Sequence, residues 1–186
     1  MERDELEHLI RAAGDVTHEY DFVIIGSQSI LGAIPNPPRE LKLSMEADIY
    51  PLNAPEKADL IDGALGEGSR FHDTYRYYAQ GVGPETPTLP SGWESRLHRV
   101  QSVNTNLKVG HCLDVLDLFM AKTAANRDKD REFNMGLLRH GFVKLELAIA
   151  MVAHMPLDDR AKRDMRARIR RWAGMLEDRG YRLPPV

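Results

Sequence analysis

The 186-residue sequence contains a single cysteine, Cys112, so no disulfide can form within the chain. This excludes a disulfide-rich secreted scaffold and makes a reducing cytoplasm the expected location. No apolar run approaches the roughly 20 residues of a membrane-spanning helix. The acidic N-terminus also lacks the positive and apolar segments of a signal peptide. We therefore expect a cytoplasmic protein with no membrane partner.

Several common catalytic motifs are missing as well. The sequence has no Gly-x-Ser-x-Gly nucleophile elbow and no Walker A loop. None of its seven histidines pairs with another at zinc-ligand spacing, and Cys112 beside His111 has no further cysteine to join it. Serine hydrolysis, P-loop chemistry and a zinc site are therefore not predicted.

The composition is that of a folded globular protein, with 42% hydrophobic and 28% charged residues. The net charge of −3 is unevenly distributed along the chain. Residues 1–110 carry 10 Lys/Arg against 17 Asp/Glu, whereas residues 111–186 carry 15 against 11. This asymmetry fits ordinary solvated surfaces, and it also fits an acidic metal-binding lobe followed by a basic lobe that meets polyanions or an acidic partner.

The apolar, β-branched run at 22–25 predicts a buried strand. The run breaks at Gly26-Ser27 and resumes as a short helical turn that Ser27 or Ser29 could cap. A strand that stops at Gly-Ser and opens a helical turn presents backbone N–H groups and a hydroxyl to an anion, usually a phosphate. We therefore predict a phosphate-binding turn at Gly26 and Ser27.

A second strand is predicted at 46–50, and it carries Glu46 and Asp48 two residues apart. Side chains at i and i+2 of a strand point to the same face, so these two carboxylates can share a divalent cation. Ala47 and Ile49 then face the core. Paired carboxylates beside a phosphate-binding turn are the minimum requirement for phosphoryl or nucleotidyl transfer.

Gly26-Ser27 followed by Glu46-x-Asp48 resembles the Gly-Ser…[Asp/Glu]-x-[Asp/Glu] signature of the nucleotidyltransferase superfamily. Within it the chain is similar to the bacterial minimal and AbiEii-like branch, some of whose members are toxin components of toxin–antitoxin pairs. The resemblance covers 22–51 and, further on, 117–130. It implies a mixed α/β sheet flanked by helices, with a helical C-terminal part.

The resemblance also implies a reaction and a metal. A nucleoside monophosphate would pass from an NTP to an acceptor, either a tRNA 3′ end, another RNA or a protein hydroxyl. Glu46 and Asp48 would bind Mg²⁺ or Mn²⁺, and Gly26 and Ser27 would hold the β- and γ-phosphates. A cognate antitoxin is a further partner that the resemblance implies.

Two downstream residues enter through the same resemblance. Lys122 would neutralise triphosphate oxygens, and Asp130 would orient Lys122 or support the metal site. The alternative for Lys122 is the polar face of an ordinary solvated helix.

The sequence also departs from the signature. Glu46 occupies a position where Asp is more common, and 18 residues separate it from Ser27, a longer gap than usual. A third carboxylate would come from a neighbouring strand, for which Asp73 is the nearest acidic candidate. Glu46 in the first metal position and the unassigned third carboxylate favour an alternative function, a catalytically silent nucleotidyltransferase fold that binds RNA or protein.

The remaining pattern predicts a nucleotidyltransferase-like core at 1–110 and a helical region at 111–186. Strands are also expected within 71–80, 93–103 and 107–110. Helices are expected at 2–13 (closed by Gly14), 55–65, 112–125, 128–140 (capped by Asp128), 143–154 and 156–178. Seven basic residues between Arg160 and Arg171 form either a solvated helix face or an electrostatic footprint for RNA or an acidic partner.

Overall fold

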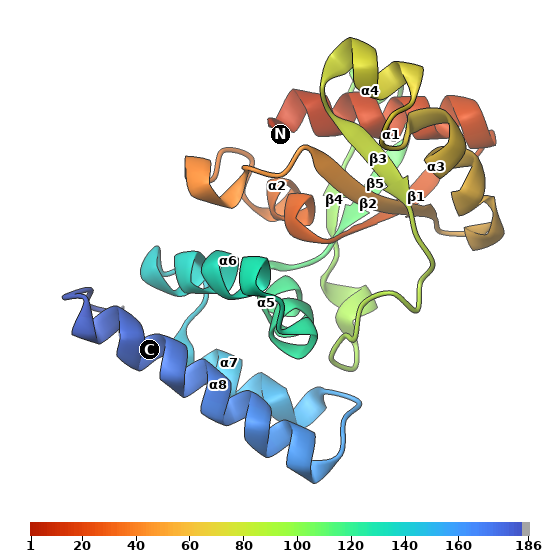
Figure 1. Cartoon of the computed structure of the whole chain (residues 1–186). Coiled ribbons are helices and arrows are strands. Elements are labelled where there is room, and N and C mark those ends of the chain that lie inside the picture. Colours follow the sequence, from red (N-terminus) through yellow and green to blue (C-terminus); the bar gives the residue numbers. More distant parts are fainter. Residues whose placement is uncertain (184–186) are drawn as a thin grey trace. The chain divides into compact units, whose positions relative to one another are not determined.

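The computed structural model describes residues 1–183 and divides into two compact units (Figure 1). The sheet unit comprises Met1–Thr86 and Arg96–Asp114. The helical unit comprises Pro87–Ser95 and the chain from Val115 onward.

The sheet unit holds five strands: β1 (Asp21–Ile25), β2 (Glu46–Pro51), β3 (Tyr78–Gly81), β4 (His98–Val100) and β5 (Val109–Cys112). Its helices are α1 (Arg3–Thr17), α2 (Ile30–Ala33), α3 (Ala58–Leu65) and α4 (Arg70–Tyr75), with short 3₁₀ turns η1 (Ser27–Ser29), η2 (Arg39–Leu41) and η3 (Pro55–Lys57). The strand order is β3-β2-β1-β5-β4. β1 runs antiparallel to β2 and parallel to β5, β2 runs parallel to β3, and β4 runs antiparallel to β5. The expected mixed sheet with flanking helices is confirmed.

Helices α1, α2 and α3 pack on one face of this sheet. A Cβ atom added at Gly110 would meet α1, one added at Gly81 would meet α3, and a glycine of α2 lies against Cys112. The strand register places these three sheet positions on the same face. Side chains alternate along a strand, so Glu46 and Asp48 point from the other face. We call the place formed by these two residues and Gly26 the carboxylate site.

The first helix is longer than the sequence predicted. It passes through Gly14 and ends at His18, which takes a left-handed φ of 60°. A Cβ atom at Gly14 would lie 1.9 Å from the Lys108 side chain. Gly14 is therefore a position of close packing, and the prediction that it ends the helix was wrong.

The prediction of a strand within 71–80 was right only for its second half. Ser69 Oγ accepts a hydrogen bond from the His72 N–H at 3.1 Å and so caps helix α4. The rings of Phe71 and Tyr75, both on α4, lie 5.1 Å and 4.6 Å from the His8 ring of α1. The aromatic residues thus pack one helix against another, and the strand begins only at Tyr78.

The last two strands are also displaced from their predicted bounds. The segment 93–103 forms a 3₁₀ turn, η4 (Trp93–Arg96), and then β4. The final strand continues to Cys112, so the following helix begins at Val115 and not at Cys112. Cys112 is completely buried, and burial raises the pKa of its thiol to about 12.

The helical unit contains α5 (Val115–Ala125), α6 (Asp128–Arg139), α7 (Leu145–Met151), the 3₁₀ turn η5 (Val152–His154) and α8 (Asp159–Asp178). Its core includes Phe119 of α5 and Trp172 of α8, whose rings meet edge to face at 6.3 Å. Asp158 caps α8 by accepting the Ala161 N–H at 2.7 Å. Over residues 1–183, no helix combines the length and apolar character needed to cross a membrane.

Candidate nucleotidyltransferase site

Gly26 ends β1 in a backbone conformation that favours glycine. Its φ of 68° and ψ of −169° fall in a region that is essentially closed to other residues. A Cβ atom at this position would lie 1.8 Å from Asp48 Oδ2. Glycine is therefore required both by the backbone and by the carboxylate that lies against it.

The turn after Gly26 forms without the side-chain cap that the sequence suggested. Neither Ser27 nor Ser29 caps the turn through its hydroxyl. Ser29 is buried, and its Oγ donates a hydrogen bond to the Gly26 carbonyl at 2.9 Å. Ser27 is half-buried at the start of η1, directly beyond the end of β1.

The two carboxylates of β2 lie on one face of their strand. Ala47 and Ile49 are completely buried, whereas Glu46 and Asp48 are half-exposed at the alternate positions. The antiparallel register pairs Asp48 with Ile25, the residue before Gly26. The structure thus brings the predicted turn and the predicted carboxylate pair together where β1 ends and the antiparallel β2 begins.

The neighbouring strand supplies no third carboxylate. In β3, the residues paired with Glu46 and Asp48 are Tyr78 and Gln80, both of which are uncharged. Asp73, the predicted candidate, lies exposed on helix α4, so its expected place on a strand was wrong.

Tyr78 is a member of the site that sequence reasoning missed. It pairs with Glu46 in the register of β2 and β3, and its phenol lies near the Glu46 carboxylate. Burial, followed by the negative charges of Glu46, Glu67 and Asp48, raises the pKa of Tyr78. No sequence motif marks this residue, because its place beside Glu46 depends on the pairing of β2 with β3.

A magnesium ion suits this donor set. Among the described residues, no three or more His, Cys, Asp or Glu side chains are grouped to hold a metal ion. Mg²⁺ does not need such a cage, since it is commonly bound by one or two carboxylates, substrate phosphates and water. Glu46 and Asp48 would provide the two protein ligands, and their half-exposed positions leave room for the rest.

The helical unit contains the other two predicted residues, joined in a buried ion pair. Lys122 Nζ lies 3.0 Å from Oδ1 of Asp130, and Asp130 is completely buried. Arg127 Nε contacts the other oxygen of Asp130 at 2.6 Å. Burial alone would raise the pKa of Asp130, but hydrogen bonds from Arg127 and the charge of Lys122 outweigh it and lower that pKa.

The Lys122 side chain is buried inside the helical unit. Only 5% of the residue is exposed, and its ammonium lies 4.6 Å from the centre of the Phe133 ring. The alternative of a solvated polar face for Lys122 was wrong. The N-cap of α6 is Arg127 and not Asp128, and the Arg127 N–H reaches Asp130 Oδ2 at 3.4 Å.

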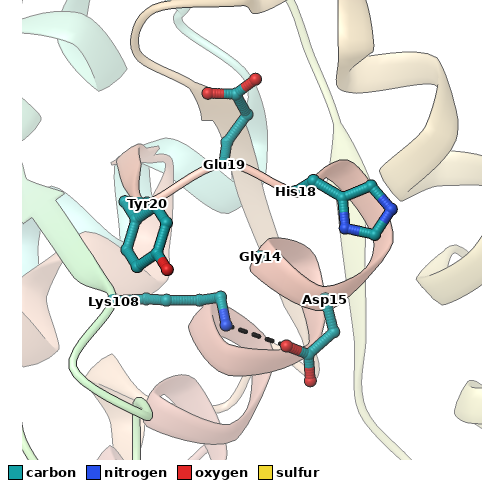
Figure 2. Close-up of a pocket in the computed structure, with 6 residues that line it drawn as sticks. All are labelled: Gly14, Asp15, His18, Glu19, Tyr20 and Lys108. Carbon is teal, nitrogen blue, oxygen red and sulfur yellow. Dashed lines mark hydrogen bonds and ion pairs between the residues drawn. The ribbon is translucent and has the colours of Figure 1, made fainter.

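A separate cavity of about 300 Å³ lies at the other end of β1 (Figure 2). Its lining includes Asp15, His18 and Lys108, and the Lys108 ammonium is paired with Asp15 at 2.8 Å. Tyr20, which also lines it, precedes β1, whereas Gly26 follows that strand. Six residues of extended chain span roughly 20 Å, so this cavity is distinct from the carboxylate site.

The family assignment comes from a comparison with family models. The model described as "Nucleotidyltransferase of unknown function (DUF6036)" matches residues 4–163, which is most of the chain. The chain belongs to this family. No curated protein and no solved structure gives a significant match. The match of the DUF6036 nucleotidyltransferase model confirms the superfamily that Gly26-Ser27 and Glu46-x-Asp48 indicated.

Proposed function

We propose that this DUF6036 protein is a metal-dependent nucleotidyltransferase that moves a nucleoside monophosphate from an NTP to an RNA or protein acceptor. The observation that carries the proposal is the contact between Gly26, after the end of β1, and Asp48 of β2. The Asp48 carboxylate occupies the space that a side chain at residue 26 would fill, and Glu46 projects from the same strand face. A phosphate-binding turn and two metal ligands therefore adjoin each other.

In this reaction the acceptor oxygen attacks the α-phosphorus of the NTP. The bond from that phosphorus to the oxygen bridging to the β-phosphorus breaks, pyrophosphate leaves, and the acceptor's proton passes to solvent. Gly26 and Ser27 would hold the β- and γ-phosphates through backbone N–H groups and the Ser27 hydroxyl. Glu46 and Asp48 would hold Mg²⁺ or Mn²⁺, which supplies charge neutralisation on the phosphates when bound.

Three finer assignments belong to the same proposal. The resemblance to the AbiEii-like branch supports a toxin–antitoxin role with a cognate antitoxin. It also supports a tRNA as one acceptor among RNAs. The role of Lys122 toward the triphosphate stays a prediction, and its buried pairing with Asp130 gives it a structural role within the helical unit as well.

One observation favours the second candidate, a catalytically silent fold that binds RNA or protein. The residues beside Glu46 and Asp48 on β3 are the uncharged Tyr78 and Gln80, so that strand provides no third acidic ligand. A silent protein would bind neither the metal nor an NTP.

The test is incubation with each labelled NTP, Mg²⁺ or Mn²⁺, and total RNA or lysate. We expect labelled product with the wild type and none with Asp48→Asn. The matched control is Asp73→Asn, which removes the same charge from an exposed helix position of the same unit and should label normally. Labelling by the Asp48 variant equal to that of the control would refute the proposed metal ligand.

A further inference from the structure

The helical unit contains a concave site whose chemistry differs from that of the carboxylate site. A cavity of about 290 Å³ lies where the first turn of α6 meets one face of α8. Four arginines line it: Arg127 and Arg131 from the α6 side, and Arg168 and Arg171 from α8. Asp128 is the only carboxylate in the lining described.

The arginines of α8 face the cavity because of helical spacing. Arg168, Arg171, Trp172 and Met175 follow one another at i, i+3, i+4 and i+7, which places them on one face of the helix. Trp172 is only 3% exposed, so it anchors this part of the helix in the core.

The guanidinium groups are unequally satisfied. Arg127 is committed to the buried Asp130, and Arg168 donates a hydrogen bond to the Thr123 carbonyl. Burial lowers the pKa of Arg168, as does the nearby charge of Arg171, while Asp164 opposes them. Within residues 1–183, the side chain of Arg171 makes no hydrogen bond or ion pair. Two like charges thus lie close together beside a cavity, which is a favourable place for an anion.

We propose that this cavity binds a backbone phosphate of a nucleic acid. Guanidinium groups match phosphate oxygens in geometry and form charge-assisted hydrogen bonds with them. The first turn of α6 adds its N-terminal partial positive charge to the same site.

Two features favour a nucleic-acid backbone over a free nucleotide. The aromatic ring in the wall, Trp172, is buried and offers no exposed face on which a base could stack. In addition, α8 carries seven basic residues and one acidic residue between Arg160 and Arg171. Arg160 and Arg163 are exposed outside the cavity lining, so positive charge continues along the helix, as an extended polyanion requires.

The test measures binding of a labelled single-stranded RNA of about 12 nucleotides at about 50 mM salt, without NTP or added metal. Arg171→Gln is compared with Arg170→Gln, which removes the same charge from the adjacent exposed residue of the same helix. Loss of a charge-assisted contact should weaken RNA binding about tenfold in the Arg171 variant. The Arg170 variant should change affinity by no more than about threefold, since it loses only a screened surface charge.

Competition distinguishes a built site from diffuse attraction. At equal ionic strength, inorganic phosphate should displace more of the bound RNA than chloride does. The Arg171 variant should lose this difference. Equal RNA affinities for the two variants, or equal displacement by phosphate and chloride, would overturn the proposal. The proposal would also be overturned if the Arg171 variant bound pyrophosphate more weakly than the wild type but bound RNA as tightly as the Arg170 variant. The ligand of the cavity would then be a small phosphate compound. The readout needs no nucleotidyl transfer, so its outcome does not depend on whether the enzyme proposal holds.

Discussion

Removing the negative charge of Asp130 should destabilise the helical unit strongly. Asn has nearly the same shape as Asp, so the Asp130→Asn variant changes charge with little change in packing. In the wild type, the completely buried carboxylate is paired with a Lys122 that is only 5% exposed. Breaking a buried ion pair by removing one partner costs about 3–5 kcal/mol, because the other charge stays buried after losing that partner.

The double variant separates the pair from its parts. Lys122→Met keeps the length of the side chain and its packing near Phe133 but removes the charge. Combined with Asp130→Asn, it should recover at least about half of the loss, because the Lys122 charge that lost its Asp130 partner is removed as well.

Urea unfolding followed by tryptophan fluorescence is the suitable assay. The chain has two tryptophans, Trp93 and Trp172, and both lie in the helical unit. The matched control is Asp128→Asn, two residues earlier in the same helix, whose side chain is fully exposed. Its free energy of unfolding should stay within about 0.5 kcal/mol of the wild type. If Asp130→Asn and Asp128→Asn unfold at the same urea concentration, the buried pair does not stabilise the unit.

Three further substitutions test other features of the sheet unit. Gly26→Ala should lower the free energy of unfolding by more than about 1 kcal/mol and abolish NTP labelling. The reason is that the new Cβ meets the Asp48 carboxylate and that φ at this position is positive. A variant with wild-type stability, measured by circular dichroism, would contradict this. Tyr78→Phe should raise the Mg²⁺ concentration needed for half-maximal labelling about tenfold without changing the fold, because the hydroxyl near Glu46 is lost. An unchanged metal requirement would exclude this positioning role. Burial, and then a nearby arginine, lowers the pKa of His8 below its usual 6.5, so the unfolded chain binds the proton more readily. The stability that His8 provides is therefore complete above about pH 6.5 and is lost as the pH falls below that value. His8→Gln should reduce the drop in melting temperature between about pH 7.5 and 5.5. A drop identical to that of the wild type would refute this cause.

The parts of the fold that depend on local pattern could be predicted from the sequence. The run at 22–25 is β-branched and apolar, and the i, i+2 spacing of Glu46 and Asp48 fixes their common face wherever the strand pairs. The helices after Val115 follow from their apolar period, and Asp158 marks the start of α8.

The parts that depend on long-range pairing could not be predicted. Tyr78 stands beside Glu46 only because β3 joins β2 in one particular register. Aromatic residues occur both in strands and in packed helices, so Phe71 does not indicate that its segment is helical. The burial of Lys122 is likewise set by residues that pack around α5, which a single amphipathic stretch does not reveal.

The buried Cys112 gives the protein a second internal reporter, independent of its tryptophans. It is the sole thiol of the chain and lies in β5 of the sheet unit, completely buried, with a pKa raised to about 12. At pH 8 only about one thiol in ten thousand is ionised in the native state, and none is accessible to reagent. The rate of alkylation therefore measures how often β5 opens, while fluorescence follows only the helical unit. The two signals from one unlabelled sample would show whether the two units unfold together or one after the other.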